Sequence, residues 1–180
     1  MAYNIIFLSS LFMVDSVFAV SVSAVAISSL STAMNDRMIE MKNVAAFKAA
    51  HHLPVEDLER ENKVVSLAQD EAAEAGLDPH SVLPFIKAQM DVAKAIQYRY
   101  FADWLSHPDA DEKPESIDNI RANISAQDKK IINYISQLLL AGDFNEKDKS
   151  ELLTLLQAPH LTESDKESLI RGLSIIRRMK

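Results

Sequence analysis

The sequence predicts an all-α protein that folds as a single domain of about six helices. Three observations support this prediction: 48% of the residues are hydrophobic, only three of the 180 residues are glycine, and the apolar residues recur at helical spacing rather than alternating as in strands. With the N-terminal leader described below set aside, about 150 residues remain, which is enough chain for one domain with a substantial core.

Each expected helix ends where the sequence supplies a chemical cause. Proline lacks the backbone N–H that a helix interior needs, and glycine readily terminates a helix, so these residues set most of the boundaries. Thr162, three residues before Asp165, has the spacing of a capping box and predicts the start of the last helix. The expected helices cover residues 28–50, 55–75, 80–106, 116–141, 147–157 and 163–178, and the breaks fall at Pro54, at Gly76 and Pro79, between Pro108 and Pro114, at Gly142 and at Pro159.

The first 34 residues contain one charged side chain, Asp15. Their apolar runs, followed by small residues, predict a secretory signal peptide over residues 1–24, with candidate cleavage after Ala19, Ala24 or Ala26. The remaining domain, residues 25–180, is then expected to be periplasmic or secreted, with core helices in 25–107 and C-terminal helices in 116–180. The alternative is a leader retained as a helical extension or anchor, although the uncharged run before Asp15 is shorter than the about 20 apolar residues that span a bilayer.

Charge and composition argue against several other functions. A net charge of −7 disfavours nucleic-acid binding, and there is no glycine-rich phosphate loop. His51 and His52 are adjacent and diverge by about 100° on a helix, so we expect no shared metal ion. The absence of cysteine means that an exported fold would not depend on a disulfide. The leucine- and isoleucine-rich C-terminal third is typical of core, and an exposed remainder would allow a homodimer.

Charged side chains lie on the apolar face of the first expected helix. Arg37 and Lys48 are eleven residues apart. At about 100° per residue, eleven positions return to within about 20° of the start, so both share a face with apolar residues such as Leu30 and Val44. A cation placed where a core residue belongs needs an anionic partner.

Three further segments direct polar groups to their apolar faces. Asp57, Arg60 and Glu61 lie within about one turn of each other, while Gln97 and Arg121 each align with an apolar stripe. Four inward cations then face two inward acids, which leaves two positive charges that a small dicarboxylate would neutralise. The alternative is that some of these side chains extend to solvent or pair with other acids. The cations are Arg37, Lys48, Arg60 and Arg121, and the acids are Asp57 and Glu61.

The same residues lie in four recognisable stretches. They are residues 37–48 (RMIEMKNVAAFK), 53–61 (LPVEDLERE), 95–98 (AIQY) and 103–105 (DWL). In type, order and spacing these stretches resemble the AroQ class of all-helical chorismate mutases, and within it the secreted gamma subclass. The resemblance covers residues 30 to 125 at the level of motifs and the rest by length and helical character only.

This resemblance implies roles for the inward residues. Arg37, Arg60 and Arg121 are expected to bind the two carboxylates of chorismate, and Lys48 and Gln97 to donate hydrogen bonds to the ether oxygen of the breaking bond. In the gamma subclass an arginine from the C-terminal half of the same chain completes the site, and Arg121 lies where that arginine is expected.

Two acids and one alanine complete the implied site. Glu61 matches the family's contact to the ring hydroxyl, and Asp57 matches an acid that lines the pocket. Ala93 departs from the pattern, because the family usually has a small hydroxyl residue one turn before the glutamine. A missing hydrogen bond to a carboxylate, worth about 1.5–3 kcal/mol at most, would weaken substrate affinity more than catalysis.

The implied reaction is the rearrangement of chorismate to prephenate, on the branch of the shikimate pathway that leads to phenylalanine and tyrosine. This isomerisation requires no nucleophile, proton transfer, metal or redox cofactor, which fits the composition. Three alternatives stay open at this point: an isochorismate-pyruvate lyase of the same helical class, a non-catalytic dicarboxylate-binding module, and a helical interaction protein.

Overall fold

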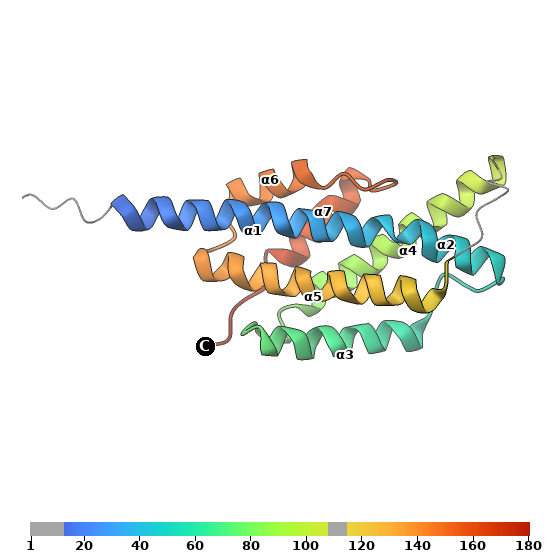
Figure 1. The fold of residues 1–180 in the computed structure, drawn as a ribbon, viewed down its shortest axis with the longest axis horizontal. Helices are drawn as coiled ribbons and strands as arrows, with labels where there is room; N and C mark the ends of the chain where they lie inside the picture. The colour runs from blue at the N-terminus through green and yellow to red at the C-terminus, as the bar shows by residue number, and fades with distance from the viewer. Residues whose placement is uncertain (1–12, 108–114) are drawn as a thin grey trace, which may run out of the picture.

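The computed structural model describes residues 13–107 and 115–180, and it describes side chains from residue 23 onward. Within these ranges the chain is helical and has no named strand, which confirms the all-α class. Figure 1 shows α1 and α5 side by side along the long axis, with α3 next to α5 and α6 next to α1, while α4 and α7 cross behind this layer. The helices are α1 (Met13–Ile39), α2 (Met41–Ala50), α3 (Leu58–Glu74), α4 (Leu83–Ser106), α5 (Ile117–Ala141), α6 (Glu146–Leu155) and α7 (Glu163–Leu173).

The first expected helix, residues 28–50, differs from the prediction in two ways. It begins earlier, at Met13, and it is interrupted at Glu40, so that α1 and α2 are separate elements. The interruption is local, because the Glu40 N–H still donates to Asp36 and the Glu40 carbonyl still accepts from Val44. Counting α1 and α2 as one bent helix gives the expected six. Of the predicted leader, residues 1–12 lie outside the described residues, as does the predicted break at 108–114.

The core lies mainly between α1 and α5, which make the most extensive helix pair of the described chain. Ile27, Leu30 and Met34 of α1 are buried, as are Ile131 and Ile135 of α5. Apolar side chains that recur every third or fourth residue place a continuous stripe on one face of each helix, and burying these two stripes supplies much of the driving force for folding. Along the described chain, no helix is both long enough and apolar enough to cross a bilayer.

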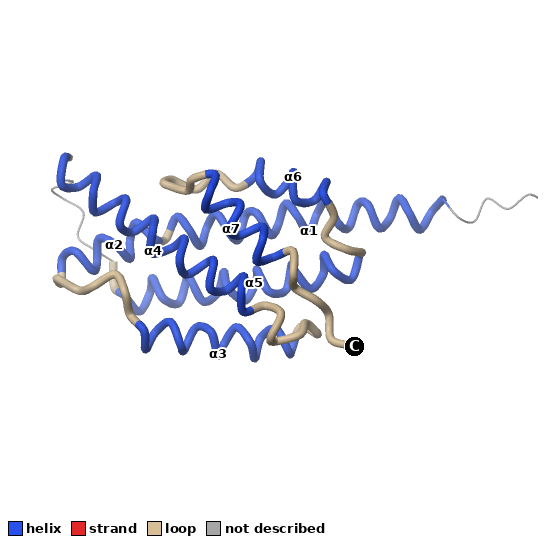
Figure 2. Tube along the Cα trace, turned by 180° about the vertical axis from the view of Figure 1, so that it is seen from behind, coloured by secondary structure: helices blue, strands red, loops and turns tan. Residues whose placement is uncertain are grey.

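The last helix is shorter than expected, because α7 ends at Leu173 rather than at residue 178. The chain after it runs as an extended tail beside the loop that follows α3, where Leu77 and Arg178 form an antiparallel bridge. The Asp78 N–H donates to the Arg177 carbonyl at 2.8 Å, which satisfies a backbone group that a continuing helix would have used. Figure 2 shows this tail crossing in front of α5 and ending near the loop that follows α3.

Local signals explain the starts of the two C-terminal helices. The capping box of Thr162 and Asp165 is present as predicted. A second capping box, formed by Asn145 and Asp148, begins α6. Each box satisfies two backbone N–H groups at a helix start, where no carbonyl is available one turn earlier.

Candidate active site

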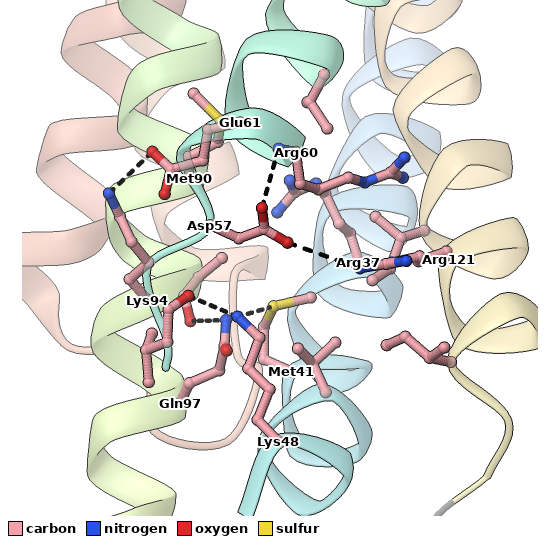
Figure 3. A pocket seen from close by; sticks show the side chains of 16 residues that line it. Arg37, Met41, Lys48, Asp57, Arg60, Glu61, Met90, Lys94, Gln97 and Arg121 are labelled. Carbon is pink, nitrogen blue, oxygen red and sulfur yellow. Dashed lines mark hydrogen bonds and ion pairs between the residues drawn. The ribbon is translucent and has the colours of Figure 1, made fainter. Parts of the chain in front are cut away.

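The described residues enclose a pocket where the end of α1, α2, the start of α3, the middle of α4 and the start of α5 meet (Figure 3). The space between the lining residues is about 690 Å³ when the part open to solvent is included. All eight residues that the sequence selected line this one pocket. They are Arg37, Lys48, Asp57, Arg60, Glu61, Ala93, Gln97 and Arg121.

Arg37 is the most buried cation of the pocket, with 5% of its surface exposed. Its Nε donates a hydrogen bond to Asp128 Oδ1 of α5 at 2.6 Å. Its Nη1 is buried and has no hydrogen-bond partner among the described residues. A buried donor without an acceptor is costly, so Nη1 is a ready position for an anionic ligand.

Lys48 is held by the chain segment that leads into α3. Its Nζ donates to the Val55 carbonyl at 2.5 Å. Burial lowers the pKa of Lys48 below its ordinary value, and Arg121 lowers it further, whereas Asp57 opposes the shift. The ammonium is therefore partly desolvated and attracts a negatively charged atom more strongly than it would in water.

Gln97 is buried beside Lys48, on the α4 side of the pocket (Figure 3). Its Nε2 donates to the Ala93 carbonyl at 3.1 Å and approaches Met41 Sδ at 3.7 Å, while its Oε1 has no partner among the described residues. Ala93 itself is buried and contributes a methyl group to the pocket wall. At the position of Ala93, the wall therefore offers a ligand no side-chain hydrogen bond.

Asp57 begins α3 and contacts two arginines. Its carboxylate caps the helix by accepting the Arg60 backbone N–H at 3.1 Å, and it pairs with Arg121 Nη2 across the pocket at 3.7 Å. The Arg121 side chain is 42% exposed, so this second contact is weak. The Arg60 guanidinium makes no ion pair with any other described residue, which leaves its donors available.

Sequence reasoning missed two charged residues of this site. Lys94 lines the pocket and pairs with Glu61 at 3.2 Å and with Asp91 at 3.3 Å. Asp128 lies behind Arg37, outside the pocket lining. Lys94 was detectable, because it precedes Gln97 by three residues and so shares its helix face.

The two missed charges leave the predicted balance unchanged. Counting Lys94 among the cations and Asp128 among the acids, the site still has two more positive than negative charges. In the described ranges, no group of three or more histidine, aspartate or glutamate side chains is placed to hold a metal ion. The geometry therefore defines a class: an all-helical protein with a cation-rich pocket that suits a small dianion.

Comparison with known proteins identifies the family to which the chain is similar. Residues 28–98 match the family model described as chorismate mutase type II. The chain is 51% identical over 173 residues, 96% of each chain, to a protein of Enterobacter agglomerans named monofunctional chorismate mutase. It is 40% identical over 137 residues, 76% of this chain and 74% of the relative, to the secreted chorismate mutase of Yersinia pestis.

Solved structures agree. The crystal structure of the secreted chorismate mutase from Yersinia pestis matches with a TM-score of 0.77 at 35% identity, over 83% of this chain and 97% of that one. A chorismate mutase from Burkholderia phymatum has the same fold, with a TM-score of 0.72 at 20% identity over 84% of this chain and 97% of that one. The chain belongs to the chorismate mutase family, which confirms the resemblance of its sequence motifs.

Proposed function

We propose that this chain, an isomerase of the chorismate mutase family, converts chorismate to prephenate in the pocket described above, with Lys48 and Gln97 as the groups that accelerate the reaction. One observation carries the proposal: two hydrogen-bond donors and three arginines converge on one pocket. Chorismate carries two carboxylates and an ether oxygen, so the number and kind of its polar groups match those of the pocket.

Substrate binding is assigned to Arg37, Arg60 and Arg121. Guanidinium groups form bidentate, charge-assisted hydrogen bonds with carboxylates, and three of them suffice for two carboxylates. Binding both carboxylates restrains the substrate in a compact form in which the reacting carbons are close. Such restraint contributes to the rate because it removes motions that would otherwise have to be lost in the transition state. Glu61 is assigned to the ring hydroxyl, because a carboxylate oxygen can accept a hydrogen bond from a hydroxyl group.

Acceleration is assigned to Lys48 and Gln97. The rearrangement breaks the ether C–O bond and forms a C–C bond within the same molecule, so no atom or proton leaves. As the C–O bond lengthens, the ether oxygen gains negative charge. Donors fixed beside that oxygen bind it more strongly in the transition state than in the ground state, which is the condition for raising the rate.

The direct test follows the ultraviolet absorbance of chorismate in the presence of the full chain or of its Lys48→Ala variant, with the product identified by NMR. We expect prephenate from the parent and a rate lower by about two orders of magnitude or more in the variant. Isochorismate, assayed in parallel, distinguishes a lyase. A folded parent that binds chorismate without turnover would instead indicate a binding module and would direct attention to Ala93.

We further propose that the chain is exported and that its leader is removed between residues 19 and 26. Two relatives, at 40% and 28% identity, are named secreted chorismate mutases. Packing favours the first of the three candidate sites, because Ser23 donates to Asp148 at 3.1 Å and Ala26 is buried. Cleavage after Ala19 keeps both contacts, whereas cleavage after Ala26 removes both. Mass spectrometry of the exported protein measures the new N-terminus.

The proposed site needs no second copy of the chain, since Arg121 of the same chain lines the pocket. A homodimer stays a prediction and is independent of the catalytic proposal. Activity measured over a range of protein concentrations, together with sedimentation of the same samples, tests this independence, because a site completed by a partner would lose specific activity on dilution.

A further inference from the structure

We infer that Asp128 is a positioning residue, which fixes the orientation of Arg37 so that its terminal nitrogens face the substrate. Asp128 does not line the pocket, and it belongs to α5, whereas Arg37 belongs to α1. The inference rests on the proposed function, because it concerns how one of the proposed carboxylate-binding arginines is held.

The contact is short and well shielded. Nε of Arg37 and Oδ1 of Asp128 are 2.6 Å apart, with 6% and 21% of the two side chains exposed. Exposed ion pairs lose most of their strength to solvent and to side-chain entropy, whereas removing one partner of a buried pair leaves an uncompensated charge and is costly. The two helices that carry these residues also form the most extensive helix pair of the fold, so both ends of the contact are anchored in the core.

The choice of nitrogen decides what the arginine can do. Asp128 occupies Nε, which leaves the two terminal nitrogens for a ligand, and Nη1 is buried with no hydrogen-bond partner among the described residues. A guanidinium is planar, so fixing one edge of the plane fixes the direction of its other donors. The arrangement therefore presents Arg37 to a carboxylate without a search through its several rotamers.

A neighbouring acid supplies a matched control. Glu71 of α3 and Asp128 border the same small cavity behind Arg37 and Arg60, but Glu71 makes no hydrogen bond or ion pair with Arg37. Burial raises the pKa of Glu71, and repulsion from Asp128 raises it further. Glu71→Gln therefore removes an acid near the site without removing the contact that holds Arg37.

The test uses the Asp128→Asn variant, for which the loss of charge and the loss of positioning have opposite expected effects on KM. By Coulomb attraction alone, removing an acid near a dianion site strengthens binding, so Asp128→Asn would lower KM. If Asp128 positions Arg37, the same change raises KM, by about tenfold or more, with a smaller effect on kcat, because misplacement of a binding group weakens the contact it makes. Glu71→Gln is expected to leave KM within about twofold of the parent or to lower it.

Two further measurements separate positioning from a general loss of structure. The Arg37 Nε–H should give an NMR signal protected from solvent exchange in the parent, and this signal should lose its protection in Asp128→Asn while the remaining spectrum stays native. In an Arg37→Ala background, Asp128→Asn should change kcat/KM by less than about threefold, because its target is gone. If Asp128→Asn does not fold, Asp128→Glu keeps the charge one methylene further out and should raise KM to a smaller extent.

An unchanged or lowered KM in folded Asp128→Asn would overturn the inference. So would a loss of kcat/KM from Asp128→Asn that is as large in the Arg37→Ala background as in the parent. These outcomes are distinct from failure of the proposed function, in which the parent chain itself would not convert chorismate.

Discussion

Two groups of donors in the pocket are held in different ways. Arg37, Arg60 and Arg121 form what we call the arginine wall, and Lys48 and Gln97 form the donor pair (Figure 3). In the arginine wall, Arg37 and Arg121 are paired with carboxylates. In the donor pair, each side chain is hydrogen-bonded to a neutral backbone carbonyl.

The difference indicates a division of labour. In the proposed reaction the arginines meet charges that the substrate carries throughout, so they should contribute to binding the ground state and the transition state alike. A backbone carbonyl is a weaker acceptor than a charged oxygen. The donor pair therefore gains most when the ether oxygen acquires negative charge, and its loss should appear in kcat rather than in KM.

The largest effect is expected from Lys48→Ala. Removing a fixed donor aimed at developing charge lowers kcat by about 10²–10³-fold, as for an oxyanion-hole donor, while KM changes by only a few-fold. Steady-state kinetics measures both constants. Lys87→Ala, an exposed lysine on α4 outside the pocket, serves as the matched control and should leave both unchanged. A rise in KM as large as the fall in kcat for Lys48→Ala would contradict the proposed division of labour between the donor pair and the arginine wall.

The next effect concerns pH. Gln97 has no proton to lose, so the parent should have nearly constant activity from about pH 5 to 8. Gln97→Glu should lose activity as pH rises, because a buried carboxyl donates to the ether oxygen only while it is protonated. A pH–rate profile of both proteins measures the difference. A steep fall above about pH 6 in the parent would refute the role of Gln97.

Lys48 sets the expected alkaline limit of the same profile. In the proposed role its ammonium must be charged to stabilise the negative charge that develops on the ether oxygen, and burial lowers its pKa below the ordinary value. A lowered pKa means that the proton leaves at a lower pH, so activity should fall as pH rises through a value below that of a free lysine. An alkaline limb at or above the ordinary lysine value would show that Lys48 is not desolvated in the working enzyme.

A smaller effect is expected from Arg121→Ala. Its side chain is 42% exposed and lies 3.7 Å from Asp57, so it is only loosely constrained. A charge-assisted hydrogen bond is worth about 1.5–3 kcal/mol, of which exposure leaves the lower part, so KM should rise about tenfold with little change in kcat. A large fall in kcat in Arg121→Ala would contradict this prediction and would show that Arg121 stabilises the transition state.

The smallest effect is a gain. Ala93→Ser adds a hydroxyl to the buried wall of the pocket, and a new hydrogen bond to a carboxylate should lower KM by a few-fold. Ala95→Ser, on the same helix but outside the pocket lining, makes the same chemical change as a control. If both variants have parental KM, residue 93 does not face the carboxylate.

The fold and most of the pocket could be predicted from the sequence, because helical periodicity determines which side chains share a face. All eight selected residues line one pocket; this spacing selected seven of them, and the resemblance of the motifs selected Ala93. Lys94 could have been predicted in the same way but was missed, since on α4 the spacing argument was applied only to Gln97. Asp128 was not accessible, because its pairing with Arg37 depends on how far α5 is displaced along α1, a tertiary property that local spacing does not contain.

The helix ends show the same limit. Thr162 and Asp165 predict the start of α7 correctly, since a capping box is a local interaction. The end of α7 could not be predicted, because the tail after Leu173 pairs with Leu77 and Asp78, nearly a hundred positions earlier in the chain. The interruption at Glu40 has no proline or glycine to mark it.

The most direct test of the division of labour compares binding with turnover in one variant. Titration calorimetry gives the Kd of prephenate, which retains both carboxylates, for the parent and for Lys48→Ala, and single-turnover kinetics gives the rate of rearrangement for each. We predict a Kd within a few-fold of the parent and a rate lower by about two orders of magnitude or more. A Kd that rises by the same factor by which the rate falls would show that Lys48 contributes as much to ground-state binding as to the transition state, which would contradict the account.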